Sequence, residues 1–137
     1  MDQIQRKTPS SIEEEELART VQEMVRIPSV YGNKANVASF VADKLRSCGL
    51  EVTVNEVLPA RPNVYGVLRG RKEEPVLIYN GHMDTVQPGD GWTQDPYGGL
   101  LRAGRIFGRG SVDMKGPLAS MMMAARALKR SDAKLER

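Results

Sequence analysis

The run Val76-Leu77-Ile78-Tyr79-Asn80-Gly81-His82-Met83-Asp84-Thr85-Val86 decides the fold that we expect for this chain. Its first four residues are apolar and lie between turn-forming segments, which is typical of a central strand covered on both faces. Polar residues follow at once, among them the only histidine of the sequence. In open α/β sheets, ligands bind just past the carboxyl ends of the strands. We therefore expect His82 and Asp84 to lie at a ligand-binding edge of a sheet.

Helical and extended patterns surround this strand. Apolar residues spaced three and four apart predict a helix that ends at Pro28 and another over residues 34–48. Alternating apolar residues predict strands over 50–55 and 63–68, and two short apolar segments around Ala103-Gly104 predict a hairpin. Pro117 is expected to open a last helix. Its predicted buried face consists of Leu118, Met121, Met122, Ala125 and Leu128. The whole pattern predicts an α/β fold.

Composition limits the classes of protein to consider. The 137 residues are 40% apolar and 27% charged, which fits one soluble domain, and no apolar run is long enough for a membrane span. A net charge of +3 with 5% aromatic residues argues against a nucleic-acid-binding surface. Residues 1–10 are predicted to be a flexible lead without a signal core, and Cys48 is the only cysteine. These features make the cytoplasm the expected location.

A second stretch, Gly108-Arg109-Gly110-Ser111-Val112-Asp113-Met114-Lys115-Gly116, adds a candidate metal ligand. The glycines allow a tight bend and a close approach to a ligand, and one carboxylate can hold two metal ions. His82 could bind a metal ion through its imidazole, with Asp84 two residues away on the same side. Taken alone, each feature has a purely structural explanation. Asp113 could be an ordinary turn aspartate, and His82 and Asp84 could be an ordinary His-x-Asp sequence in a loop.

Together the two stretches resemble the signatures of the M20 metallopeptidase family, which includes acetylornithine deacetylases, succinyl-diaminopimelate desuccinylases and carboxypeptidases. Residues 77–86 match its first signature and residues 108–116 its second. Trp92 and Asp95-Pro96 lie between them in the family's order, and residues 26–30 resemble the helix end that opens most members. The resemblance implies a three-layer α/β fold like that of zinc exopeptidases, with a mixed, partly parallel sheet flanked by helices, here incomplete.

The resemblance also implies roles for the site residues. His82 would bind the first metal ion, Asp113 would bridge two ions, and Asp84 would act as a catalytic residue by orienting His82. The implied cofactors are two divalent ions, with zinc expected and cobalt or manganese also suited to nitrogen and oxygen ligands. The second metal site is incomplete in this chain.

The family's remaining machinery has no counterpart in these residues. A glutamate pair, a further carboxylate and a second histidine are missing, because Asp132 and Glu136 are the only acidic residues after Asp113. The dimerisation domain through which full-length relatives are expected to form homodimers is missing too. We therefore expect residues 11–137 to be the N-terminal portion of the catalytic domain, inactive alone.

The resemblance implies hydrolysis of an amide bond, with an N-acyl amino acid or a short peptide as substrate. A different class of function stays open: a catalytically dead α/β module that binds a partner or complements a second chain. A phosphate-binding loop over residues 104–110 is disfavoured, because the spacing has neither the lysine nor the glycine order of such loops.

Overall fold

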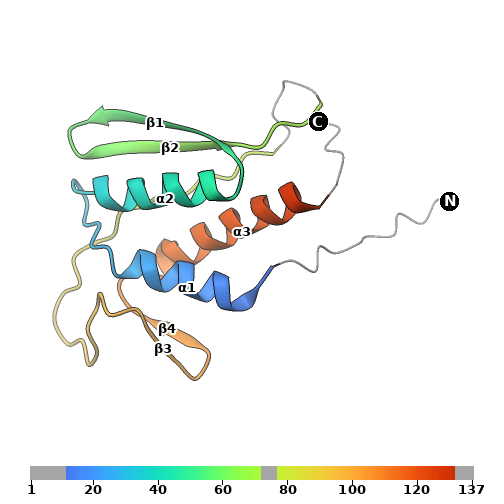
Figure 1. Ribbon diagram of the computed structural model, residues 1–137. Helices are drawn as coiled ribbons and strands as arrows, with labels where there is room; N and C mark the ends of the chain where they lie inside the picture. Colours follow the sequence, from blue (N-terminus) through green and yellow to red (C-terminus); the bar gives the residue numbers. More distant parts are fainter. Residues whose placement is uncertain (1–11, 72–76, 132–137) are drawn as a thin grey trace.

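Three helices and two β-hairpins make up the computed structural model of the chain, which describes residues 12–71 and 77–131 (Figure 1). The expected flexible lead, residues 1–10, lies outside the described residues. The elements, in chain order, are α1 (Glu14–Val25), α2 (Ala35–Ser47), β1 (Glu51–Leu58), β2 (Arg61–Val67), β3 (Leu100–Arg102), β4 (Arg105–Phe107), the tight turn η1 (Ser111–Lys115) and α3 (Gly116–Arg130).

Both hairpins are antiparallel; the strands of the first lie near the two predicted strands, and the second is the predicted hairpin. In the first, β1 and β2 pair from Glu51 opposite Val67 onward. In the second, β3 and β4 join through Ala103 and Gly104, whose φ angles of 51° and 72° suit a tight hairpin turn. The parallel component is one isolated bridge between Val30 and Thr85. The α/β class is confirmed, with its sheet present only in small pieces.

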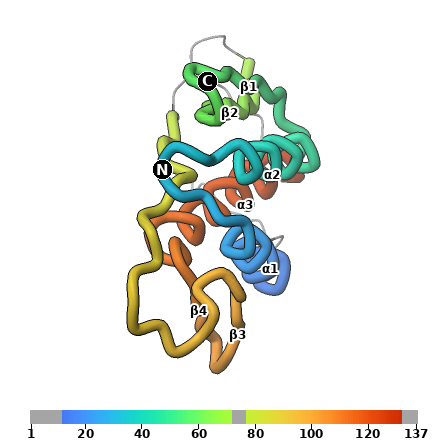
Figure 2. The backbone as a smooth tube through the Cα atoms, turned by 90° about the vertical axis from the view of Figure 1, so that its left-hand side faces the viewer, coloured from blue at the N-terminus to red at the C-terminus, as the bar shows by residue number. Residues whose placement is uncertain are grey.

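The elements are stacked with the helices in the middle. In Figure 2 the β1–β2 hairpin lies at one end, α2, α3 and α1 follow, and the β3–β4 hairpin lies at the other end. Residues 77–99, which precede β3, run along one side of this stack. None of the helices in the described part of the chain is long and apolar enough to cross a membrane.

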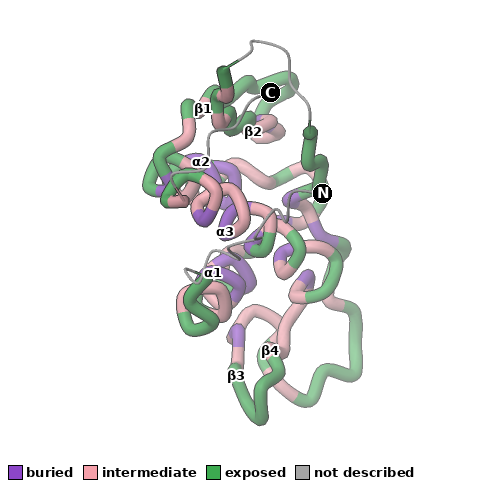
Figure 3. Tube along the Cα trace, turned by 90° about the vertical axis from the view of Figure 1, so that its right-hand side faces the viewer, coloured by how far each residue is buried: buried purple, intermediate pink, exposed green. Residues whose placement is uncertain are grey.

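The hydrophobic core lies between the facing sides of the three helices, where Figure 3 shows most of the buried backbone. The thiol of Cys48 belongs to this core, and burial raises its pKa, as expected for a packed rather than a reactive cysteine. The centre of α3's buried face differs from the prediction: of the five predicted residues only Met122 is fully buried. The fully buried residues of α3 are Ala119, Met122, Met123 and Ala127.

The expected central strand is not buried. Leu77, Ile78 and Tyr79 are 66%, 75% and 55% exposed, so the prediction of a strand covered on both faces is wrong for this chain. The reason is the lack of strand partners: within the described residues, residues 77–84 pair with no strand. Pairing starts only at Thr85, through its bridge to Val30.

Glu16 of α1 forms pH-dependent ion pairs with the other two helices. Its carboxylate forms ion pairs with Arg126 of α3 and with Lys44 of α2, and these side chains are about four-fifths buried. The hydrogen bond from Arg126, aided by the charges of Arg126 and Lys44, outweighs the effect of burial and lowers the pKa of Glu16 below 4.5.

We expect Glu16→Gln to lower the free energy of unfolding by about 1 kcal/mol at neutral pH. Because the folded-state pKa is lowered, this stabilisation is complete above pH 4.5 and is lost as the pH falls through the lowered value. Urea denaturation of both proteins at pH 7 and in acid measures it. Glu23→Gln, on the same helix, is the control. A difference between wild type and Glu16→Gln that persists undiminished in strong acid would contradict the assignment.

Candidate metal centre

His82 and Asp113 come together although 31 positions separate them in the sequence. The Nε2 atom of His82 lies 2.9 Å from Oδ1 of Asp113. Both groups face solvent, with 47% of the His82 side chain and 85% of the Asp113 side chain exposed. The structure thus brings together the two residues that the sequence predicts as metal ligands.

The third predicted residue, Asp84, contacts the other nitrogen of the same ring. Nδ1 of His82 lies 3.0 Å from the main-chain carbonyl oxygen of Asp84 and 3.9 Å from its carboxylate. A carbonyl only accepts hydrogen bonds, so Nδ1 is the donor and carries the proton of the neutral ring. Nε2 is then the nitrogen left with a lone pair, which is the atom a metal ion needs.

The charge state of His82 follows from the same contacts. Burial alone would lower the pKa of His82, but the hydrogen bond to the Asp84 carbonyl and the nearby carboxylate of Asp113 together raise it above 6.5. When the ring is protonated, Nε2 donates to Oδ1 of Asp113. When it is neutral, both atoms are acceptors and can share a cation instead.

The segment that carries His82 is held to the chain that leaves α1. The hydroxyl of Ser29 donates to the carbonyl of Met83 at 2.8 Å, and the N–H of Thr85 donates to the carbonyl of Ser29 at 2.8 Å. Ser29 and Thr85 are both buried. This attachment fixes the main chain on the C-terminal side of His82.

The turn η1 carries Asp113 and is pinned at its two ends. Gly110, which precedes it, has a φ of +81°, and the N–H of Lys115 donates to the Gly110 carbonyl at 2.8 Å. Lys115 itself is completely buried, and burial lowers the pKa of its ammonium group to about 8. Its Nζ donates to the carbonyls of Met24 and Ile27 at 2.9 and 2.8 Å, both at the end of α1.

A cleft of about 470 Å³ opens over these residues. Its walls include His82, Asp84 and Asp113, together with Tyr31 and Arg109. Neither Tyr31 nor Arg109 was predicted as a site residue. The sequence did carry a signal for Arg109, which lies inside the second glycine-rich stretch.

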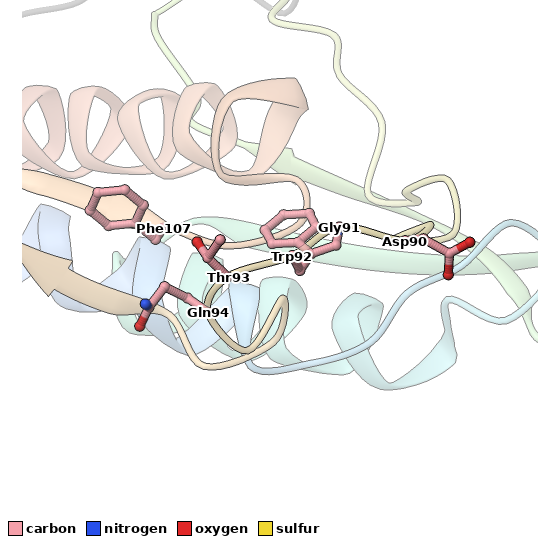
Figure 4. A pocket seen from close by; sticks show the side chains of 6 residues that line it. All are labelled: Asp90, Gly91, Trp92, Thr93, Gln94 and Phe107. Carbon is pink, nitrogen blue, oxygen red and sulfur yellow. The ribbon is translucent and has the colours of Figure 1, made fainter.

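A smaller hollow of about 280 Å³ lies over the loop before β3 and shares none of its lining with the cleft. Figure 4 shows its side chains, which come from the loop residues 90–94 and from Phe107 of β4. Asp90 is its only ionisable residue, so the hollow offers no second set of metal ligands.

The donor set of the cleft suits a divalent metal ion as one part of a site. An imidazole nitrogen with a free lone pair faces a carboxylate oxygen, which is the mixed ligation that zinc, cobalt and manganese accept. Within residues 12–71 and 77–131, however, no group of three or more histidine, cysteine and acidic side chains lies close enough to hold an ion. The described residues therefore bring together two candidate metal ligands, His82 and Asp113.

Comparison with known proteins identifies the family. A model of peptidase family M20/M25/M40 matches residues 78–137, which contain His82, Asp84 and Asp113. The chain is 41% identical over 112 residues to a succinyl-diaminopimelate desuccinylase of Methylocella silvestris and 36% identical over 114 residues to one of Methylobacterium radiotolerans. The chain belongs to the M20 metallopeptidase family. The M20 resemblance of the two glycine-containing stretches is thereby confirmed.

The chain spans a little over a quarter of these M20 relatives. The two alignments cover 77% and 80% of this chain but 28% and 29% of the relatives. The crystal structure of human carnosine dipeptidase 1 resembles the chain with a TM-score of 0.73 and 26% identity, over 84% of this chain and 28% of the dipeptidase chain. The similarity fits an N-terminal part of the M20 catalytic domain with an incomplete fold.

Proposed function

We propose that this chain contributes the first metal ligands of an M20 hydrolase that cleaves an amide bond in an N-acyl amino acid or a short peptide. The approach of His82 Nε2 to Asp113 Oδ1 carries this proposal. The relatives support the reaction class, since they are named as a desuccinylase and a dipeptidase. We also propose the cytoplasm as its location, because the lone Cys48 is a buried free thiol.

Each of the three predicted residues has a task in this proposal. His82 would bind the first ion through Nε2, and Asp113 would bridge it to a second ion through its two carboxylate oxygens. Asp84 would keep the ring in the required tautomer through its carbonyl, and through its carboxylate if that moves closer than 3.9 Å. A bound divalent ion would supply Lewis acidity toward a substrate carbonyl and a water molecule.

We propose that the 137 residues alone do not turn over substrate. Hydrolysis needs a general base to take the proton of the attacking water, and the sequence after Asp113 contains no glutamate pair in the position where the family places that base. Two protein ligands are also fewer than the three that hold a catalytic zinc ion.

Titration of the chain with zinc should therefore reveal weak binding at His82, with a dissociation constant above about 1 μM, because only two ligands converge. The sequence contains one histidine, so a single set of imidazole NMR signals reports the binding directly. In parallel, N-succinyl and N-acetyl amino acids and dipeptides should remain intact in the presence of zinc.

The zinc titration and the hydrolysis assay test different parts of the proposal. Imidazole signals that do not move at millimolar zinc would overturn the metal site. Submicromolar binding by a monomer, or measurable hydrolysis, would instead overturn the proposal that the chain lacks essential parts.

The second candidate function is a catalytically dead module that binds or complements another chain. The exposed run Leu77-Ile78-Tyr79 favours it, because it leaves on the surface apolar side chains and main chain that pairs with no strand among the described residues. The gene sequence beyond Arg137 discriminates between the two. An in-frame continuation with a glutamate pair and a later histidine supports the hydrolase, whereas an immediate stop codon and a stable product support the module.

A further inference from the structure

Lys115 is a buried cation at the end of the turn η1 that carries Asp113. Its exposure is 0%, and it is the largest completely buried side chain among the described residues. Within those residues it forms no ion pair, and its Nζ donates only to the main-chain carbonyls of Met24 and Ile27. Burying an ammonium group without an ion-pair partner lowers the stability of a fold unless its hydrogen bonds offset the cost of desolvation. The role of Lys115 is therefore to be found in the segments that its two hydrogen bonds connect.

The tip of the turn η1 has few contacts in the described structure, and one of them joins it to the His82 segment: the main-chain N–H of His82 donates to Sδ of Met114 at 3.3 Å. Val112 is 83% exposed and the Asp113 side chain is 85% exposed, and the only side-chain hydrogen bond of Asp113 in the described structure is the one to His82. Besides this hydrogen bond of Met114, the position of Asp113 depends on the two ends of the turn. One end is Gly110, and the other is Lys115, whose side chain reaches under the turn to α1.

The segment with His82 is attached to the same part of the chain. Ser29, two residues after Ile27, accepts from Thr85 and donates to Met83, the neighbour of His82. The last turn of α1 and the chain that follows it, residues 24–30, thus hold both the His82 segment and, through Lys115, the Asp113 turn. These two attachments to one short stretch of chain contribute to the distance between the two candidate ligands.

We propose that Lys115 is a positioning residue that holds Asp113 opposite His82 by anchoring the turn η1 to the end of α1. This inference rests on the proposed metal function of His82 and Asp113. Lys115 itself touches neither side chain in the described contacts, so its influence on a metal ion passes through Asp113.

A double-mutant cycle on zinc affinity tests the inference, with zinc binding followed by the imidazole signals of His82. Lys115→Met keeps the length of the apolar stem but removes the donors, and it should weaken zinc binding about tenfold. Asp113→Asn should weaken it at least as much. Because Lys115 acts through Asp113, the double variant should bind zinc no more weakly than Asp113→Asn alone.

Two controls separate positioning from loss of stability or charge. Lys129→Met makes the same substitution at an exposed lysine of α3, and Val41→Ala weakens the core of α2 away from the cleft. Both should keep wild-type zinc affinity within about twofold, as expected for sites with no shared partners. A loss with Val41→Ala as large as that with Lys115→Met would assign Lys115 to stability alone and overturn the inference.

The remaining outcomes distinguish the inference from the function on which it rests. If Asp113→Asn leaves zinc affinity unchanged, the proposed metal site fails and the inference with it. If Asp113→Asn weakens binding and Lys115→Met does not, only the inference is overturned. Should Lys115→Met fail to fold, Lys115→Gln replaces it, because its shorter side chain cannot reach both carbonyls, and folded Lys115→Gln with full wild-type affinity would equally overturn the inference.

Discussion

Zinc affinity is expected to fall more than about 100-fold when His82 is replaced by alanine. This loss is larger than the one expected when a residue that only orients a ligand is replaced. The variant removes the only imidazole of the chain and leaves Asp113 as the one remaining proposed ligand. A single carboxylate in water binds zinc weakly, because water competes for the ion. Competition with a chromogenic chelator measures the affinity of wild type and variant alike.

Asp84→Asn is the matched comparison for this variant. It keeps the main-chain carbonyl that lies 3.0 Å from Nδ1 of His82 and changes only the carboxylate at 3.9 Å. We therefore expect a loss of about tenfold or less. Equal zinc affinity in His82→Ala and wild type would place the ion elsewhere, and an Asp84→Asn loss as large as that of His82→Ala would mean that the carboxylate itself is a ligand.

Local sequence signals predicted the helices, the strands of the first hairpin and the second hairpin because the forces that form them are local. Pro28 and Pro117 limit helices wherever they occur, and Ala103-Gly104 suits a hairpin turn regardless of its surroundings. The burial of residues 77–79 could not be predicted in this way. A strand is buried only when other segments cover it, and within the described residues none does.

The candidate ligands could be predicted from the sequence, but the residue that we propose to position one of them could not. Histidine and aspartate at the ends of glycine-bracketed segments can be recognised in the sequence, and the structure brings His82 and Asp113 within 2.9 Å of each other. The role of Lys115 could not be recognised, because a lysine in a polar stretch is normally solvated. Its burial depends on α1, some 90 positions earlier in the chain, and only the tertiary structure reveals it.

Gly110→Ala is expected to destabilise the chain by about 3 kcal/mol and to weaken zinc binding with it. Two unfavourable contributions to the free energy of folding add at position 110. The φ of +81° is unfavourable for any residue with a β-carbon, and the new methyl group would lie 2.6 Å from Cγ2 of the buried Thr85. Thr85 cannot move away easily, because its N–H donates to Ser29 and its carbonyl accepts from Tyr31.

Gly104→Ala separates the backbone strain from the steric contact. Gly104 has a similar φ of +72°, but a β-carbon there would have nothing within 4 Å. It should therefore show the backbone cost alone, about 1 kcal/mol by urea denaturation, with unchanged zinc affinity. The excess loss in Gly110→Ala then measures the contact between the turn and the His82 segment. If both variants lose the same stability and Gly110→Ala binds zinc as wild type does, close packing of these two segments does not determine where Asp113 lies.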